Sequence, residues 1–127
     1  MLDCGLLGAM IDVPSRIITL GDSSFSEYKG AFVENFVAAE LARKTEGRLH
    51  YWISEGIAEV DFLVEHDGKI LPLEVKNGMN RAIKSLWVYA DKFKPPRVYR
   101  ASPRNFECRD NFGNIPLYAA ELFPQLR

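Results

Sequence analysis

The sequence predicts an α/β (α+β) fold, in which helices flank a mixed sheet made of an antiparallel meander followed by a parallel strand. Three observations predict it. Residues 59–76 indicate a hairpin closed by Asp67-Gly68, a dipeptide typical of two-residue type I′ turns. Residues 28–44 and 80–93 carry apolar side chains at helical spacing. The second helix lies between two strand-like segments, and such a βαβ crossover places its strands parallel.

Length and composition indicate one domain. A chain of 127 residues can bury one normal core but not two, so we expect residues 1–127 to form a single domain. No apolar run approaches the roughly 18 residues that a membrane span needs. Cys4 and Cys108 stand apart, without metal-binding spacing. We therefore expect a cytoplasmic protein with free thiols and no membrane partner.

Charge is distributed unevenly along the chain. Residues 1–75 contain six Lys/Arg and 13 Asp/Glu, whereas residues 76–109 contain nine Lys/Arg and two Asp/Glu. The basic segment suggests a surface that meets a polyanion. The alternative is that the acidic and basic parts neutralise each other within the fold.

The N-terminal third is predicted to be mainly helical. Residues 1–11 contain an apolar cluster that indicates one or two helical turns, and a loop with one short strand at 16–20 follows. Residues 28–44 form a helix with a broad apolar face, which Gly47 ends. Glu34 lies beside that face, so it is either a solvated or capping glutamate or a side chain that reaches over the adjoining edge of the sheet.

The central strands follow. Residues 48–54 alternate as a strand does, with Leu49, Tyr51 and Ile53 on one face and His50 and Trp52 on the other. In the hairpin, the Asp67-Gly68 turn sets the register, which places Val60, Phe62 and Val64 on one face.

The same register places Asp61 opposite Glu74 and Glu59 opposite Lys76. Like charges that face each other destabilise a sheet. The Asp61/Glu74 pair therefore indicates that something cationic lies between the two carboxylates, and a divalent metal is the first candidate.

The second half supplies the crossover. After Asn77-Gly78 we expect a helix capped near Asn80 and ended by Pro95-Pro96. Its predicted buried stripe consists of Ile83, Leu86, Trp87, Ala90 and Phe93. Residues 97–101 form the parallel strand, and an apolar run within 115–126 indicates a short docking helix.

The hairpin carries the candidate chemistry. Asp61, Glu74 and the backbone carbonyl of Val75 offer hard oxygen ligands suited to Mg²⁺ or Mn²⁺. Lys76 projects from the same strand face as Glu74, where it can orient a metal-bound water or neutralise phosphate charge. These parts suit hydrolysis of a phosphodiester. The sequence has no P-loop, so we expect no ATP site in this chain.

The D-x₁₂-E-x-K pattern on a hairpin, after a helix with a glutamate, resembles the PD-(D/E)XK nuclease superfamily. More closely, the chain resembles the C-terminal domain of unknown function of prokaryotic AAA-type ATPases. The matching segments are LDCGLL (2–7), GAFVENFVAAEL (30–41), AEVDFLVEHDGKILPLEVK (58–76) and IPLYAAELF (115–123). Val60 departs from the superfamily motif, which has proline before the aspartate.

This resemblance implies a restriction-endonuclease-like sheet, with Asp61 and Glu74 as metal ligands and Lys76 as the catalytic lysine. It implies that Glu34 is an auxiliary metal ligand or positions the water. It also implies that an ATPase domain precedes this one, so that the chain is the C-terminal fragment of a longer protein.

Three functional hypotheses follow. The first is a metal-dependent nuclease-like domain that hydrolyses DNA, with phosphate contacts from Arg81, Lys84, Arg97, Arg100 and Arg104. The second is a catalytically inactive DNA-binding, regulatory or protein-interaction module of an AAA-type ATPase, in which Lys76 pairs with Glu59. The third is a domain that forms homo-oligomers or docks a partner through the apolar segments 1–11 and 115–126.

Overall fold

The computed structural model describes residues 3–10, 12, 26–46, 48–78 and 82–125. Its helices are α1 (Cys4–Met10), α3 (Ser26–Lys44), α4 (Lys84–Phe93) and the 3₁₀ helix η2 (Leu117–Leu122). Its strands are β1 (His50–Ile53), β2 (Glu59–His66), β3 (Lys69–Val75), β4 (Val98–Ser102), β5 (Glu107–Cys108) and β6 (Phe112–Pro116). None of the described helices is long and apolar enough to span a membrane.

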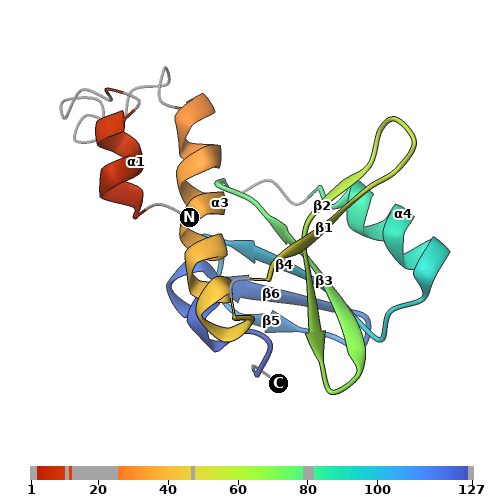
Figure 1. Cartoon of the computed structure of the whole chain (residues 1–127). Helices are drawn as coiled ribbons and strands as arrows, with labels where there is room; N and C mark the ends of the chain where they lie inside the picture. The colour runs from red at the N-terminus through yellow and green to blue at the C-terminus, as the bar shows by residue number, and fades with distance from the viewer. Residues whose placement is uncertain (1–2, 11, 13–25, 47, 79–81, 126–127) are drawn as a thin grey trace.

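The strands form one mixed sheet in the order β1-β2-β3-β4-β6-β5 (Figure 1). The meander β1-β2-β3 is antiparallel, and α4 leads from β3 to the parallel strand β4, which confirms the predicted crossover. Two strands were not predicted: β6 lies parallel to β4, and β5 pairs antiparallel with β6. The short helix predicted for the apolar run LYAAELF (117–123) is observed as the 3₁₀ helix at 117–122, and residues 115 and 116 pair with β4 as part of β6.

The hairpin between β2 and β3 has the predicted turn. Asp67 and Gly68 have φ angles of 52° and 72°, the left-handed values that a type I′ turn requires at both central residues. The pairing follows the predicted register from His66–Lys69 to Phe62–Leu73, and the ladder ends there. The predicted cross-strand pairs of Asp61 with Glu74 and of Glu59 with Lys76 are therefore wrong.

A β-bulge in β2 explains why the ladder ends. His50 pairs with Leu63 and Trp52 pairs with Val60, so β2 has two residues where β1 has one. The extra residue reverses the alternation of side chains at Asp61 and Phe62. The sequence pattern predicted that Val60 and Val64 share one face of the sheet. Because of the bulge, Val60 instead packs in the cluster with α4, and Val64 packs in the cluster with α3.

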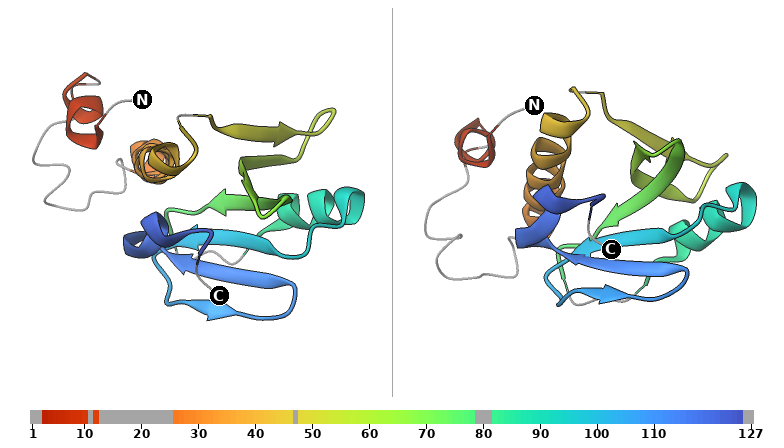
Figure 2. Two further views of the ribbon diagram at one scale, coloured as in Figure 1. Left: turned by 60° about the horizontal axis from the view of Figure 1, so that its bottom comes forward. Right: turned by 90° about the horizontal axis from the view of Figure 1, so that it is seen from below.

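The sheet has an apolar cluster on each face. One cluster joins α3 and η2 to the sheet through buried residues such as Val37, Leu73 and Phe123. The other joins α4 to the sheet through Leu86 and Val98. Both views of Figure 2 show α4 apart from α3, across the sheet.

The predicted helices differ from the observed ones in detail. The helix predicted over 28–44 is confirmed and begins at Ser26. The other helix begins at Lys84, and the predicted cap Asn80, the predicted stop Gly47 and the predicted strand at 16–20 lie outside the described residues. Tyr89 belongs to the buried stripe of α4, whereas Trp87 and Phe93 are 39% and 48% exposed.

The face of β1 that packs on the core is the one that carries Trp52, whose ring lies edge-on to Tyr89 with centroids 5.3 Å apart. Tyr51 and Ile53, on the opposite face, are exposed. The exposed side of this edge strand is thus the more apolar one. The bulge in the neighbouring strand β2 increases the local twist of the β1-β2 pair, which helps protect such an edge from pairing with another chain.

Candidate functional site

The predicted metal-site residues come from three neighbouring elements. Asp61 lies at the bulge in β2, and Glu74 and Val75 end strand β3. Lys76 follows directly, its N–H donating to the carbonyl of Ala101 at 2.9 Å, which continues the pairing with β4. Glu34 lies on α3. The bulge and the end of the hairpin ladder thus position this site.

The Asp61 side chain takes the place of a ladder hydrogen bond. Its Oδ2 accepts from the backbone N–H of Val75, with 2.6 Å between the two heavy atoms. Burial raises the pKa of Asp61 to about 6, against the opposing effect of the Val75 N–H. The negative charges of Glu34 and Glu74 raise that pKa further, while Lys76 lowers it. The pKa of Asp61 therefore depends on the charges of Glu34, Glu74 and Lys76.

Glu74 is a buried carboxylate with one oxygen unsatisfied. The residue is 5% exposed, and its Oε1 lies 2.5 Å from Lys76 Nζ. Its Oε2 is buried and has no hydrogen-bond partner among the described residues. A buried acceptor without a partner carries a desolvation cost, which a bound cation would remove.

Lys76 is paired differently from the prediction. Its side chain, 33% exposed, forms an ion pair with Glu74 and not with Glu59. The reason is that the ladder ends at Phe62–Leu73, so that Glu59 does not lie across from Lys76. The lysine and the carboxylate are on the same strand face, two residues apart.

Glu34 lies at the surface of α3, near the other charged groups. Partial burial raises its pKa, the neighbouring charge of Glu59 raises it further, and Lys76 lowers it. The helix therefore brings a third carboxylate within electrostatic range of Asp61, as the sequence suggested.

The residues present fit a hard divalent cation that keeps part of its water shell. Across the described parts of the chain, no three His, Cys, Asp or Glu side chains come together as a metal-ligand group. Magnesium, however, is commonly held by one or two carboxylates together with water and substrate phosphate. Asp61, Glu74 and the Val75 carbonyl make such a set, and Glu74 Oε2 has no hydrogen-bond partner among the described residues.

A buried polar row continues from this site across the sheet and was not predicted from the sequence. Glu74 is the register partner of Arg100 on β4, and Arg100 is the register partner of Asn114 on β6. Asn114, fully buried, accepts from Arg100 Nε and from the Ser102 hydroxyl, each at 2.7 Å. A single asparagine in an unpredicted strand offers no pattern that could have revealed this role.

The predicted phosphate contacts occupy different environments. Lys84 is exposed at the start of α4, and Arg104 is half-buried in the loop after β4. Arg97 Nε donates to the carbonyl of Asp110 at 3.4 Å. Arg100 is 3% exposed and lies in the wall of a pocket. Arg81 lies outside the described residues.

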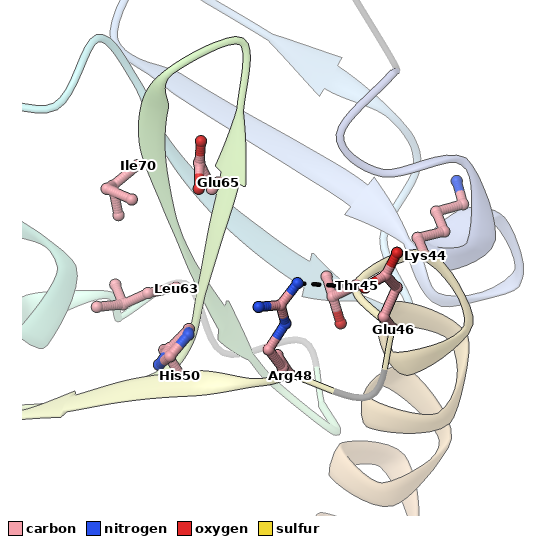
Figure 3. A pocket seen from close by; sticks show the side chains of 8 residues that line it. All are labelled: Lys44, Thr45, Glu46, Arg48, His50, Leu63, Glu65 and Ile70. Atoms are coloured by element: carbon pink, nitrogen blue, oxygen red, sulfur yellow. Dashed lines mark hydrogen bonds and ion pairs between the residues drawn. The ribbon is translucent and has the colours of Figure 1, made fainter.

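A cavity of about 610 Å³ lies elsewhere, between the end of α3 and the hairpin (Figure 3). Its cations are already engaged: Arg48 pairs with Glu46 at 3.2 Å, and Lys44 Nζ donates to the carbonyl of Phe123 at 3.3 Å. None of the predicted metal-site residues lines it. This cavity is therefore separate from the carboxylate site.

The apolar segments predicted to dock a partner do expose large side chains. Leu6 and Met10 are exposed on α1, and Tyr118 and Leu122 are exposed on η2. Oligomerisation through them stays a prediction.

Comparison with protein families gives one match. A model described as a domain of unknown function, DUF4143, matches residues 29–119, which are 91 of the 127 residues and include every predicted site residue. No curated protein and no solved structure matches the chain.

Proposed function

Since the chain belongs to the DUF4143 family, we propose that this domain of unknown function is a metal-dependent nuclease-like domain that hydrolyses DNA phosphodiester bonds. The observation that carries the proposal is that the carboxylates of Asp61 and Glu74 lie close enough to interact where the regular pairing of the hairpin ends. Asp61 is fixed there by the Val75 N–H, and Glu74 keeps a buried oxygen without a partner. Lys76 lies beside them.

The order of elements supports a relation to the PD-(D/E)XK nucleases. A helix with a glutamate precedes the hairpin, and a crossover helix and a parallel strand follow it, as in a restriction-endonuclease-like sheet. The D-x₁₂-E-x-K spacing spans the hairpin, with all three residues at its open end. These features support the proposal by resemblance, because a fold alone does not establish an activity.

In this proposal Asp61, Glu74 and the Val75 carbonyl hold Mg²⁺ or Mn²⁺. The ion, when bound, polarises the phosphate and lowers the pKa of a coordinated water. Lys76 exchanges part of its contact with Glu74 for a contact with the attacking water or with a phosphate oxygen. Glu34, on α3, positions water or serves as an auxiliary ligand.

DNA is proposed as the substrate because the basic residues follow the carboxylate site in the chain. Residues 76–109 hold nine Lys/Arg against two Asp/Glu. Lys84 at the start of α4 and Arg97 before β4 offer charge to the phosphate backbone, where contact requires charge more than base readout.

A second candidate function is a catalytically inactive DNA-binding or regulatory module of an AAA-type ATPase. The observation that favours it is the ion pair between Lys76 and Glu74, because the lysine already neutralises the carboxylate that a metal needs. In this case Lys76 is a structural partner, and the pair at the hairpin end stabilises the fold only.

A cleavage assay separates the two functions. Supercoiled and linear DNA are incubated with the protein in Mg²⁺ or Mn²⁺, with EDTA as the blank. The nuclease proposal predicts cleavage by the wild type and a loss of at least about 100-fold in Glu74→Gln and Lys76→Ala. The control Lys69→Ala, which removes an exposed lysine at the other end of β3, should cleave normally.

Two results would overturn the nuclease proposal. The first is wild-type DNA cleavage no greater than the EDTA blank by a folded protein. The second is equal cleavage by the wild type and both site variants. Binding of DNA without cleavage would instead support the inactive module.

A further inference from the structure

A second pocket, of about 450 Å³, lies where α4 approaches β4 and β6. Pockets of this size accommodate ligands as large as a nucleotide. Its wall combines three arginines with two aromatic rings and one glutamate: Trp87, Arg100, Arg104, Glu107, Arg109 and Phe112. This mixture of guanidinium groups and ring faces is suited to a ligand that carries both a phosphate and a planar base.

The pocket carries a net positive charge. Glu107 Oε1 lies 2.6 Å from Arg109 Nη2, so this carboxylate neutralises one of the three arginines. The Arg104 guanidinium has no ion-pair partner within the described ranges of the chain. The described lining residues include no other carboxylate, so an anion that enters would meet the Arg104 guanidinium beside Arg100.

Asn114 contacts the side chain of Arg100 and the backbone of Arg104. Its Oδ1 accepts from Arg100 Nε at 2.7 Å, and its Nδ2 donates to the backbone carbonyl of Arg104 at 3.2 Å. The Arg100 guanidinium also lies over the Phe112 ring, 5.2 Å from its centroid. Because the Arg100 side chain is held before a ligand arrives, its part in binding costs less side-chain entropy.

Trp87 lines the pocket and is partly exposed. It shares a helical stripe with the buried Ile83, yet 39% of its surface is exposed, next to the arginines. Trp52, the other tryptophan, packs edge-on against Tyr89 and Phe93. A partly exposed tryptophan beside arginines is the arrangement on which bases of single-stranded nucleic acids stack.

The pocket adjoins the carboxylate site. Arg100 in its wall is the register partner of Glu74. The two residues therefore lie on neighbouring strands, and such strands are about 4.8 Å apart. A nucleic-acid strand bound in the pocket would thus lead to the carboxylates.

From these observations we propose that the pocket binds a nucleotide unit of a single-stranded nucleic acid, with a phosphate at Arg100 and Arg104 and a base stacked on Trp87. Duplex DNA offers the same phosphates but hides its base faces, so it cannot use Trp87. The inference rests on the proposed function and specifies its substrate as single-stranded or locally unpaired.

The test uses a Trp52→Phe background, in which Trp87 is the single tryptophan of the chain. A labelled oligothymidine of roughly 12 nucleotides is titrated in EDTA, and Trp87 fluorescence and label anisotropy are measured. The proposal predicts quenching of Trp87 and at least about 10-fold weaker binding after Trp87→Ala or Arg104→Ala. Lys69→Ala, the matched charge control, should bind within about twofold of the parent. A duplex should bind more weakly without quenching Trp87.

Equal affinity for duplex and single strand without quenching would overturn this inference, as would unchanged binding by both pocket variants when circular dichroism shows that they are folded. Binding is measured in EDTA and cleavage in Mg²⁺, so the failures of the two proposals can be told apart. Binding with no wild-type cleavage would therefore refute the nuclease and support the pocket, while cleavage without quenching would do the reverse.

Discussion

Asp61 Oδ2 lies 2.6 Å from the backbone nitrogen of Val75, so a side chain of β2 satisfies an N–H of β3 that a ladder carbonyl would normally satisfy. The bulge at Asp61 and Phe62 makes this contact possible by ending the regular pairing. The same contact holds a carboxylate beside Glu74 and Lys76. The site therefore depends on a break in the sheet.

Asp61→Asn should remove a pH-dependent cost in stability. The folded-state pKa of Asp61 is about 6 against an ordinary value of 3.8, so the folded protein retains a proton that the unfolded chain releases. Stability contributed by Asp61 therefore falls as pH rises from about 4 to about 6, and stays low above that. Asparagine can still accept from Val75. The variant should gain stability over the wild type as pH rises, measured by urea unfolding without metal.

The control is Glu65→Gln, which changes an exposed carboxylate in the same hairpin. Its stability difference from the wild type should stay nearly constant across this pH range. A difference for Asp61→Asn that is equally flat would contradict the buried, coupled state of the carboxylate.

Lys76→Met should destabilise the domain and make its stability metal-dependent. Without the ammonium, the buried Glu74 carboxylate loses the ion pair at Oε1, and its Oε2 already has no hydrogen-bond partner, so the loss costs about 1–3 kcal/mol. Mn²⁺ at millimolar concentration should recover part of this loss, because the ion replaces the lysine charge. Thermal unfolding with and without Mn²⁺ measures both effects.

Lys84→Met, at an exposed position on α4, provides the comparison for loss of a lysine charge. It should unfold close to the wild-type temperature. If Lys76→Met behaves in the same way and Mn²⁺ changes neither variant, the pairing of Lys76 with a metal-competent carboxylate is wrong.

Asn114→Ala should be among the most destabilising polar substitutions. It removes four hydrogen bonds at a fully buried position, leaving Arg100, the Ser102 hydroxyl and two loop carbonyls without that partner. We expect a loss of about 2–4 kcal/mol in the free energy of unfolding. The exposed Asn111→Ala should cost less than about 0.5 kcal/mol. Equal chemical stability of the two variants would contradict the buried network.

The predicted hairpin was confirmed because its determinants are local. Asp67-Gly68 favours positive φ at two adjacent residues, and this turn alone sets the pairing as far as Phe62–Leu73. The bulge could not be predicted in the same way, since it arises from the pairing of β2 with β1.

Strand β6 was not predicted because its residues have little intrinsic strand preference. The sequence Phe112–Pro116 contains glycine, asparagine and proline, and its pairing with β4 comes from tertiary context. Gly113 is needed there because a Cβ would lie 2.8 Å from Tyr99 Cδ1. Trp87 was misassigned for a related reason: helical spacing places it toward the sheet, but spacing cannot show that a pocket lies in front of it.

The most direct measurement of the central claim is a calorimetric titration of the protein with Mn²⁺ and Mg²⁺. We expect one ion per chain at up to millimolar concentration, with binding lost in Asp61→Asn and Glu74→Gln and retained in Glu65→Gln. No binding by the wild type, or equal binding by all four proteins, would contradict a metal site at Asp61 and Glu74.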